Sequence, residues 1–108
     1  MCKGDGLQMM RMIPIQLENG TAIGIEVKLP KTTLIAVSTD KGYIMCGALD
    51  IQLLNDKLKD RQIIAARAVG VRTIEQLLEA PVESVTYEAE VLGITTGMKG
   101  SDALVRMI

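Results

Sequence analysis

Apolar and polar residues alternate over two stretches near the beginning of the chain, residues 13–17 and 23–29. A period of two is typical of strands with one buried face, because successive side chains of a strand point to opposite sides. The turn-forming residues Asn19 and Gly20 separate the two stretches, so the pattern predicts a β-hairpin. Pro14 cannot donate a backbone hydrogen bond, which indicates that the first strand is an edge strand.

The length of the turn decides which side chains of this hairpin share a face. A two-residue loop of Asn19 and Gly20 would put the apolar faces of the two strands out of phase. A three-residue loop that also includes Glu18, with Gly20 in the left-handed conformation, would pair Ile15 with Ile23. Because a slip of one residue turns a whole face over, we expect the three-residue loop.

Two further stretches, residues 33–39 and 43–48, are nearly continuous in apolar residues, which indicates central strands buried on both faces. Apolar residues then recur at helical spacing after Asp50, a preferred N-cap. Residues 62–71 form another apolar run. A hairpin, a helix and a strand in that order predict a crossover to a parallel neighbour.

Thr73 and Gln76 form a capping box that opens a short helix near the C-terminal end. Pro81 separates this helix from a second one, which we expect to carry Val85 and to end at Gly93 as its C-terminal cap. The whole pattern predicts an α+β fold. Its mixed sheet consists of two N-terminal β-hairpins plus a strand added by a helical crossover, followed by short C-terminal helices.

The chain of 108 residues is the size of one domain. Its polar, glycine-containing start predicts a disordered leader over residues 1–8, followed by a single α+β domain over residues 9–108. The hydrophobic share of 48 % excludes a disordered chain. A two-stranded hairpin needs a cover for its apolar face, so residues 12–29 are predicted to be an oligomerisation region.

Charge and composition narrow the expected partners. The formal net charge is −1 and the only aromatic residues are two tyrosines, so neither phosphate attraction nor base stacking favours nucleic acid. No apolar run approaches the ~20 residues of a membrane span, and the N-terminus lacks the apolar segment of a signal peptide. We therefore expect a cytoplasmic protein with no nucleic-acid and no membrane partner.

The sequence contains no histidine. This excludes nucleophile activation by histidine and the usual catalytic zinc sites. The two cysteines, Cys2 and Cys46, have neither the spacing of zinc ligands nor the number needed for a disulfide framework. We expect no metal and no cofactor.

Two stretches carry a resemblance to a known family: "GYIMCGALD" at residues 42–50 and "RAVGVRTIEQLLEAP" at residues 67–81. With the residues around them, from about position 13 to about position 98, the chain resembles the YunC-like family of bacterial and archaeal proteins, a domain of unknown function. The resemblance implies an α+β domain whose N-terminal β-region mediates formation of a tetramer. It implies no activity and no catalytic residues, because none are defined for the family.

Cys46 and Asp50 are the candidates for chemistry. Cys46 follows a strand and precedes the helix that Asp50 is expected to cap, and helix N-termini favour thiolates. The competing interpretation makes Cys46 a small core residue and Asp50 a plain N-cap. The sequence favours the core interpretation because no histidine is present to activate the thiol.

Arg67, Gly70, Arg72 and Thr73 form a candidate ligand-binding site. A strand ends here, a glycine permits close approach of the backbone, and a capped helix begins beside arginines. This combination can bind an anion. In the alternative interpretation, Thr73 only caps the helix and both arginines pair with acidic side chains.

These observations lead us to expect a homo-oligomer, a tetramer by the family resemblance, that binds a small anion or acts as a regulatory or interaction domain without catalysis. The alternative is a small histidine-independent enzyme that uses Cys46 with Asp50 or Arg72. A purely structural interaction module is a third interpretation.

Overall fold

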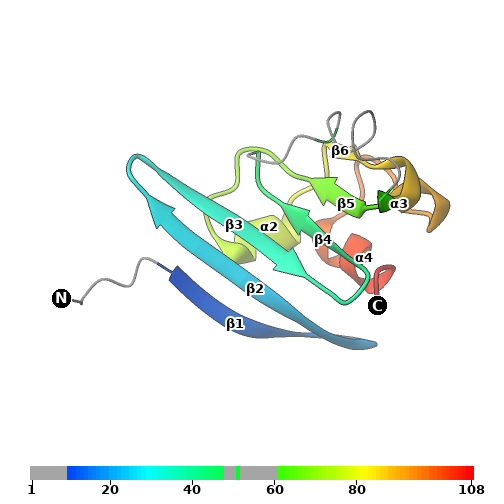
Figure 1. The fold of residues 1–108 in the computed structure, drawn as a ribbon, viewed down its shortest axis with the longest axis horizontal. Helices are drawn as coiled ribbons and strands as arrows, with labels where there is room; N and C mark the ends of the chain where they lie inside the picture. Colours follow the sequence, from blue (N-terminus) through cyan, green and yellow to red (C-terminus); the bar gives the residue numbers. More distant parts are fainter. Residues whose placement is uncertain (1–9, 48–50, 52–60) are drawn as a thin grey trace.

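The computed structural model describes residues 10–47, 51 and 61–108. The strands are β1 (Met10–Leu17), β2 (Gly20–Leu29), β3 (Thr32–Ser38), β4 (Gly42–Met45), β5 (Ile64–Arg67) and β6 (Ser84–Val85). The helices are α2 (Ile74–Glu79), α3 (Tyr87–Val91) and α4 (Gly100–Val105). The strands form one sheet in sequence order, antiparallel throughout except for the parallel pair β4 and β5 (Figure 1). This arrangement confirms the expected α+β fold with its mixed sheet.

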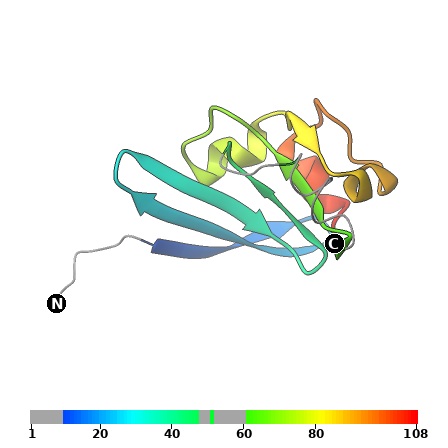
Figure 2. The ribbon, with the colours of Figure 1, turned by 45° about the horizontal axis from the view of Figure 1, so that its top comes forward.

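Helices α2 and α4 pack against one face of the sheet, here called the inner face (Figure 2). Helix α2 contacts β2 and β3, while α4 contacts β4 and α2. The core between these layers consists of aliphatic side chains and methionine, as a chain without Phe or Trp requires. Its largest fully buried members include Ile35, Ile44, Ile74, Leu77, Ile94, Leu104 and Met107.

The opposite face, here called the outer face, is covered at one end of the sheet and exposed at the other. Over β4 and β5 it is covered, because Ile51 is buried there and packs with Ala65, Tyr43 and Ile63. Over β1 and β2 it presents the outer patch, defined as Met10, Met12, Ile23, Ile25 and Val27. Two of its methionines are more than 60 % exposed, and Ile23 is 39 % exposed.

The first hairpin forms, but the predicted register is wrong by one residue. Leu17 pairs with Gly20 and Ile15 pairs with Ala22, so the loop contains only Glu18 and Asn19. Gly20 is not among the glycines with positive φ in the described part of the chain. Ile13, Ile15 and Leu17 of β1 consequently point to the inner face, whereas Ile23, Ile25 and Val27 of β2 point to the outer face.

Small residues on β2 explain this register. The apolar side chains of β1, such as Ile13 and Ile15, pack on the inner core, where β2 contributes Ala22 and Gly24. A Cβ atom on Gly24 would lie 2.8 Å from Cδ1 of Ile15 and 3.1 Å from Cδ1 of Ile74. The inner face therefore has space for large side chains from β1 and α2 only because β2 has small residues there.

The second strand pair and the crossover are confirmed. Strands β3 and β4 lie in the middle of the sheet, and β5 joins β4 in parallel. The helix predicted after Asp50 and the leader predicted over residues 1–8 lie outside the described residues, apart from Ile51. No helix in the described part of the chain is long and apolar enough to cross a membrane.

The C-terminal elements are mostly as predicted. Thr73 caps α2, and Gly93 ends α3 with φ 85° while its N–H donates to Glu90. The prediction that Val85 belongs to the second helix is wrong, because Val85 lies in the short strand β6. Helix α3 begins two residues later, after its N-cap Thr86. The buried Thr86 hydroxyl accepts hydrogen bonds from the N–H groups of Ala65 and Ala89, which joins β5 to α3.

Residues near the end of the chain return to the β1–β2 turn and to the β3–β4 turn. The Asn19 side-chain amide donates to the carbonyl of Val105 over 3.0 Å, and the Thr39 hydroxyl donates to the carbonyl of Met107 over 3.1 Å. A Cβ atom on Gly20 would lie 2.9 Å from the Ile108 side chain. The first turn is thus held by residues more than eighty positions away in the sequence.

Candidate functional site

Three adjoining grooves lie where the β2–β3 hairpin faces the loop between β5 and α2. The first groove, about 430 Å³ in volume, is lined by Arg11, Glu26, Lys28, Thr33, Arg72 and Thr73. The second, about 560 Å³, is lined by Lys28, Leu29, Lys31, Thr32, Thr33, Gly70, Val71 and Arg72. The third, about 320 Å³, is lined by Leu29, Thr32, Thr33, Leu34, Cys46, Gly47 and Val71. Volumes of this order suit small molecules.

Unequal strand lengths open this region. Strand β4 ends at Met45, which pairs with Ala36, so the first part of β3 extends beyond the end of β4. The β2–β3 turn contains Pro30 followed by Lys31 with φ 67°, the combination that a type II turn uses. Lys28 and Thr33 lie directly opposite each other just behind this turn, and their side chains project to the same face.

The loop on the other wall is fixed by hydrogen bonds around Thr73. The Thr73 hydroxyl accepts from the N–H of Gln76 over 3.0 Å. The Gln76 side-chain oxygen in turn accepts from the N–H of Arg72 over 2.8 Å, rather than from the N-cap N–H of an ideal capping box. Gly70 supplies the left-handed backbone of the loop, with φ 77°. These bonds hold the start of the Arg72 side chain at the groove.

Positive charge dominates the first two grooves. Their lining contains four cationic side chains and a single carboxylate, Glu26. Glu26 is engaged by Arg11, whose Nη2 lies 3.4 Å from the carboxylate oxygen. Lys28, Lys31 and Arg72 form no ion pair with any other described residue. Their charges are therefore available to a ligand.

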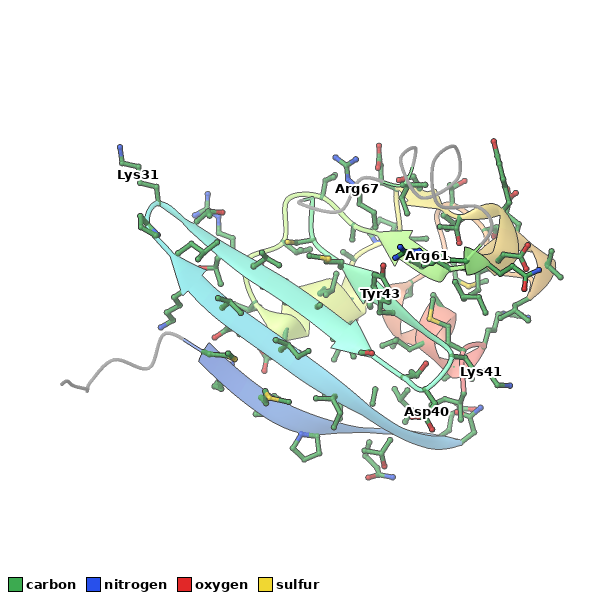
Figure 3. The ribbon with its side chains drawn as sticks, viewed as in Figure 1. Lys31, Asp40, Lys41, Tyr43, Arg61 and Arg67 are labelled. Carbon is green, nitrogen blue, oxygen red and sulfur yellow. The ribbon has the colours of Figure 1, made fainter. Side chains whose placement is uncertain are left out.

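The structure brings three of the four predicted ligand-binding residues together. Gly70, Arg72 and Thr73 all line these grooves, whereas Arg67 does not. Arg67 ends β5, and its Nε lies 3.7 Å from a carboxylate oxygen of Glu83. Figure 3 shows Arg67 well away from Lys31 at the hairpin tip. Arg67 fits the ion-pair interpretation.

The structure adds cations that sequence reasoning missed. Lys28 and Lys31 come from β2 and its turn, some forty positions before Arg72 in the sequence. Lys28 is a polar position of the alternating second strand and Lys31 follows Pro30 in the turn after it, but the pattern assigned neither residue a role in binding. Their meeting with Arg72 depends on the position of the β5–α2 loop, which no local pattern reveals.

Cys46 belongs to the core. Its residue is 6 % exposed and free of any disulfide, and its Sγ lies 3.5 Å from the N–H of Ile35, which donates to it. It lines only the third groove, while Arg72 lines only the first two. Asp50 lies outside the described residues. This burial matches the core interpretation of Cys46.

Metal ligands do not gather in the described part of the chain, where no three Cys, Asp or Glu side chains are grouped to hold an ion. The groove chemistry is instead that of cations, threonine hydroxyls and backbone. Such a set is suited to anions.

Residues 45–107 match the family described as Domain of unknown function (DUF1805). The uncharacterized protein YunC of Bacillus subtilis (strain 168) is 60 % identical over 100 residues, which cover 93 % of this chain and 99 % of that protein. The chain belongs to this family. The resemblance found in the sequence is therefore confirmed.

A solved structure has the same fold. The crystal structure of a protein of unknown function from Thermoplasma acidophilum is 27 % identical to this chain and has a TM-score of 0.83. The likeness covers 93 % of this chain and 94 % of the other. Neither relative's name nor the family description states an activity, so the function must be argued from the grooves.

Proposed function

We propose that this protein is a homo-oligomeric domain that binds a small anionic ligand in the first and second grooves. The observation that carries the proposal is the convergence of Lys28, Lys31 and Arg72 on one site, without a carboxylate partner among the described residues. The chain as a whole carries a net charge of −1, so this local excess of positive charge is not a consequence of composition.

Each cation has a distinct role in this proposal. Arg72 presents a planar guanidinium that can bind two oxygen atoms of a carboxylate or phosphate at once. Lys28, on the opposite wall, contributes a point charge, and Lys31 lies at the mouth of the second groove. Thr33 lies between them and can donate its hydroxyl hydrogen.

The test uses inorganic phosphate and citrate as probes, with binding measured by calorimetry and by the shift in melting temperature. A ligand that binds only the folded state raises the melting temperature by mass action. Arg72→Ala and Lys28→Met should each lower the affinity at least tenfold, about the contribution of one charged hydrogen bond. Lys41→Ala is the matched control, because Lys41 is an exposed lysine in another hairpin turn and lines none of the three grooves.

Unchanged affinity in Arg72→Ala and Lys28→Met would contradict the proposed site, as would the absence of binding by the wild type. A uniform loss in all three variants would indicate a general charge effect instead of a site. Both results are distinguishable from unfolding by circular dichroism of the same samples.

Self-association is the second part of the proposal. It is supported by the outer patch, which presents contiguous apolar side chains on the edge strand β1 and on β2. The family resemblance implies a tetramer through this same N-terminal region, and residues 12–29 remain the predicted oligomerisation region. We also propose a cytoplasmic location, on the sequence features given above.

A further inference from the structure

The three grooves share lining residues and therefore form one path along the hairpin. Thr33 lines all three. The first and second grooves also share Lys28 and Arg72. The second and third grooves also share Leu29, Thr32 and Val71. A ligand longer than a bare anion can therefore extend from one groove into the next.

The chemistry changes along this path. The first groove has five charged or hydroxyl side chains besides Glu26, whereas the third has no charged side chain. The third groove is instead lined by Leu29, Leu34, Val71 and the buried Cys46, with the two threonines as its polar members. One end is suited to a negative group and the other to a hydrocarbon group.

The middle of the path presents backbone groups of β3 that pair with no described strand on the side of β4. The carbonyl of Ile35 accepts from the N–H of Cys46 over 3.0 Å, so Ile35 directs its backbone groups towards β4. In a strand, residues two positions apart direct these groups the same way. Thr33 therefore points its N–H and carbonyl past the end of β4, which pairs with β3 only from Ala36 to Ser38. These groups can bind a polar atom in the middle of a ligand.

We infer that the ligand is an amphipathic organic acid, with an anionic head and a compact apolar group of about four to six carbons. The head lies between Lys28 and Arg72, and the apolar group lies against Leu34 and Val71. This inference rests on the proposed anion site and adds the apolar half of the ligand.

The experiment compares two series of probes by calorimetry. Acetate, butanoate and 4-methylpentanoate form the carboxylate series, and methyl phosphate and butyl phosphate form the phosphate series. Affinity should rise about fourfold for each methylene group that enters the third groove, as expected from the transfer free energy of hydrocarbon. The series with the higher affinity at equal chain length identifies the head group.

Val71→Ser should remove most of this dependence on chain length. Val69→Ser is the matched control, because Val69 is 48 % exposed in the same loop and lines none of the three grooves. Leu34→Ser provides a second test, should Val71→Ser fail to fold. In the wild type, 4-methylpentanoate should also shift the amide resonances of Cys46 and Gly47, and acetate should not.

The outcomes separate the two proposals. If phosphate binds and Arg72→Ala abolishes that binding, but affinity does not depend on chain length, the anion site holds and the amphipathic ligand is wrong. Equal loss of chain-length dependence in Val69→Ser and Val71→Ser would also overturn the inference. If no probe of either series binds the wild type, both proposals fail together.

Discussion

The outer face of the sheet is covered at one end and open at the other. Over β4 and β5, Ile51 packs with the fully buried Ala65 and the partly buried Tyr43. Over β1 and β2, the outer patch is equally apolar but its two methionines are mostly exposed. The comparison teaches that hydrophobic alternation alone does not specify which face is buried, because the alternating isoleucines of β1 point to the inner face and those of β2 to the outer face.

The largest expected effect comes from crowding the inner face beneath the open end. Gly24→Val would place side-chain atoms against Ile15 and Ile74, where even a Cβ atom lies within 3.1 Å of both. We expect a loss of about 2–3 kcal/mol in the free energy of unfolding, measured by urea denaturation. The control is Thr21→Val, at an exposed position of the outer face beside the patch, which should change stability by less than about 1 kcal/mol. Equal losses in the two variants would contradict the assignment of faces.

Self-association through the outer patch can be tested by introducing a charged side chain into it. Ile25→Lys should convert a multimer into monomers at micromolar concentration, as measured by sedimentation equilibrium, because a partner would have to bury the ammonium group. The same substitution at Ile15 should instead lower the stability of each chain, since Ile15 packs on the inner core. A wild type that sediments as a monomer would refute self-association, and dissociation by Ile15→Lys with unchanged stability would refute the observed register.

The smallest effect concerns the covered end and depends on pH. Burial raises the pKa of the Tyr43 phenol above its ordinary value of 10.0. The folded protein therefore holds this proton more tightly than the unfolded chain, and the associated stability is complete below pH 10 and is lost as pH rises through the folded pKa. Tyr43→Phe should reduce the alkaline decline of the unfolding free energy between pH 9 and about pH 11. An identical decline in wild type and variant would mean that Tyr43 is not covered.

The sequence predicted the elements whose signals are local. Thr73 as a helix cap and Gly93 as a helix end follow from side-chain chemistry within one turn, and both are present. The parallel pairing of β4 and β5 followed from the order of elements and the handedness of crossovers. These predictions needed no knowledge of distant contacts.

The register of the first hairpin could not be obtained in this way. It depends on Ile74, which packs against Gly24 from fifty positions later in the chain. The same applies to the candidate site, where Arg72 was predicted but its partner Lys28 was not. Val85 was assigned to a helix because its backbone pairing with Ala66 in β5 leaves no mark on the local pattern.

The hydrogen bond from Asn19 to Val105 has a consequence for the order of folding. It joins residues 86 positions apart, so the turn between β1 and β2 receives its final support from a segment that is synthesised much later. Long-range closure of this kind slows folding, because the entropy of closing the chain is lost before the contact forms. Until residues 105–108 dock, the early hairpin has apolar side chains on both faces and only part of its inner cover. This interval, rather than the finished fold, is when the protein is most exposed to aggregation and to chaperones.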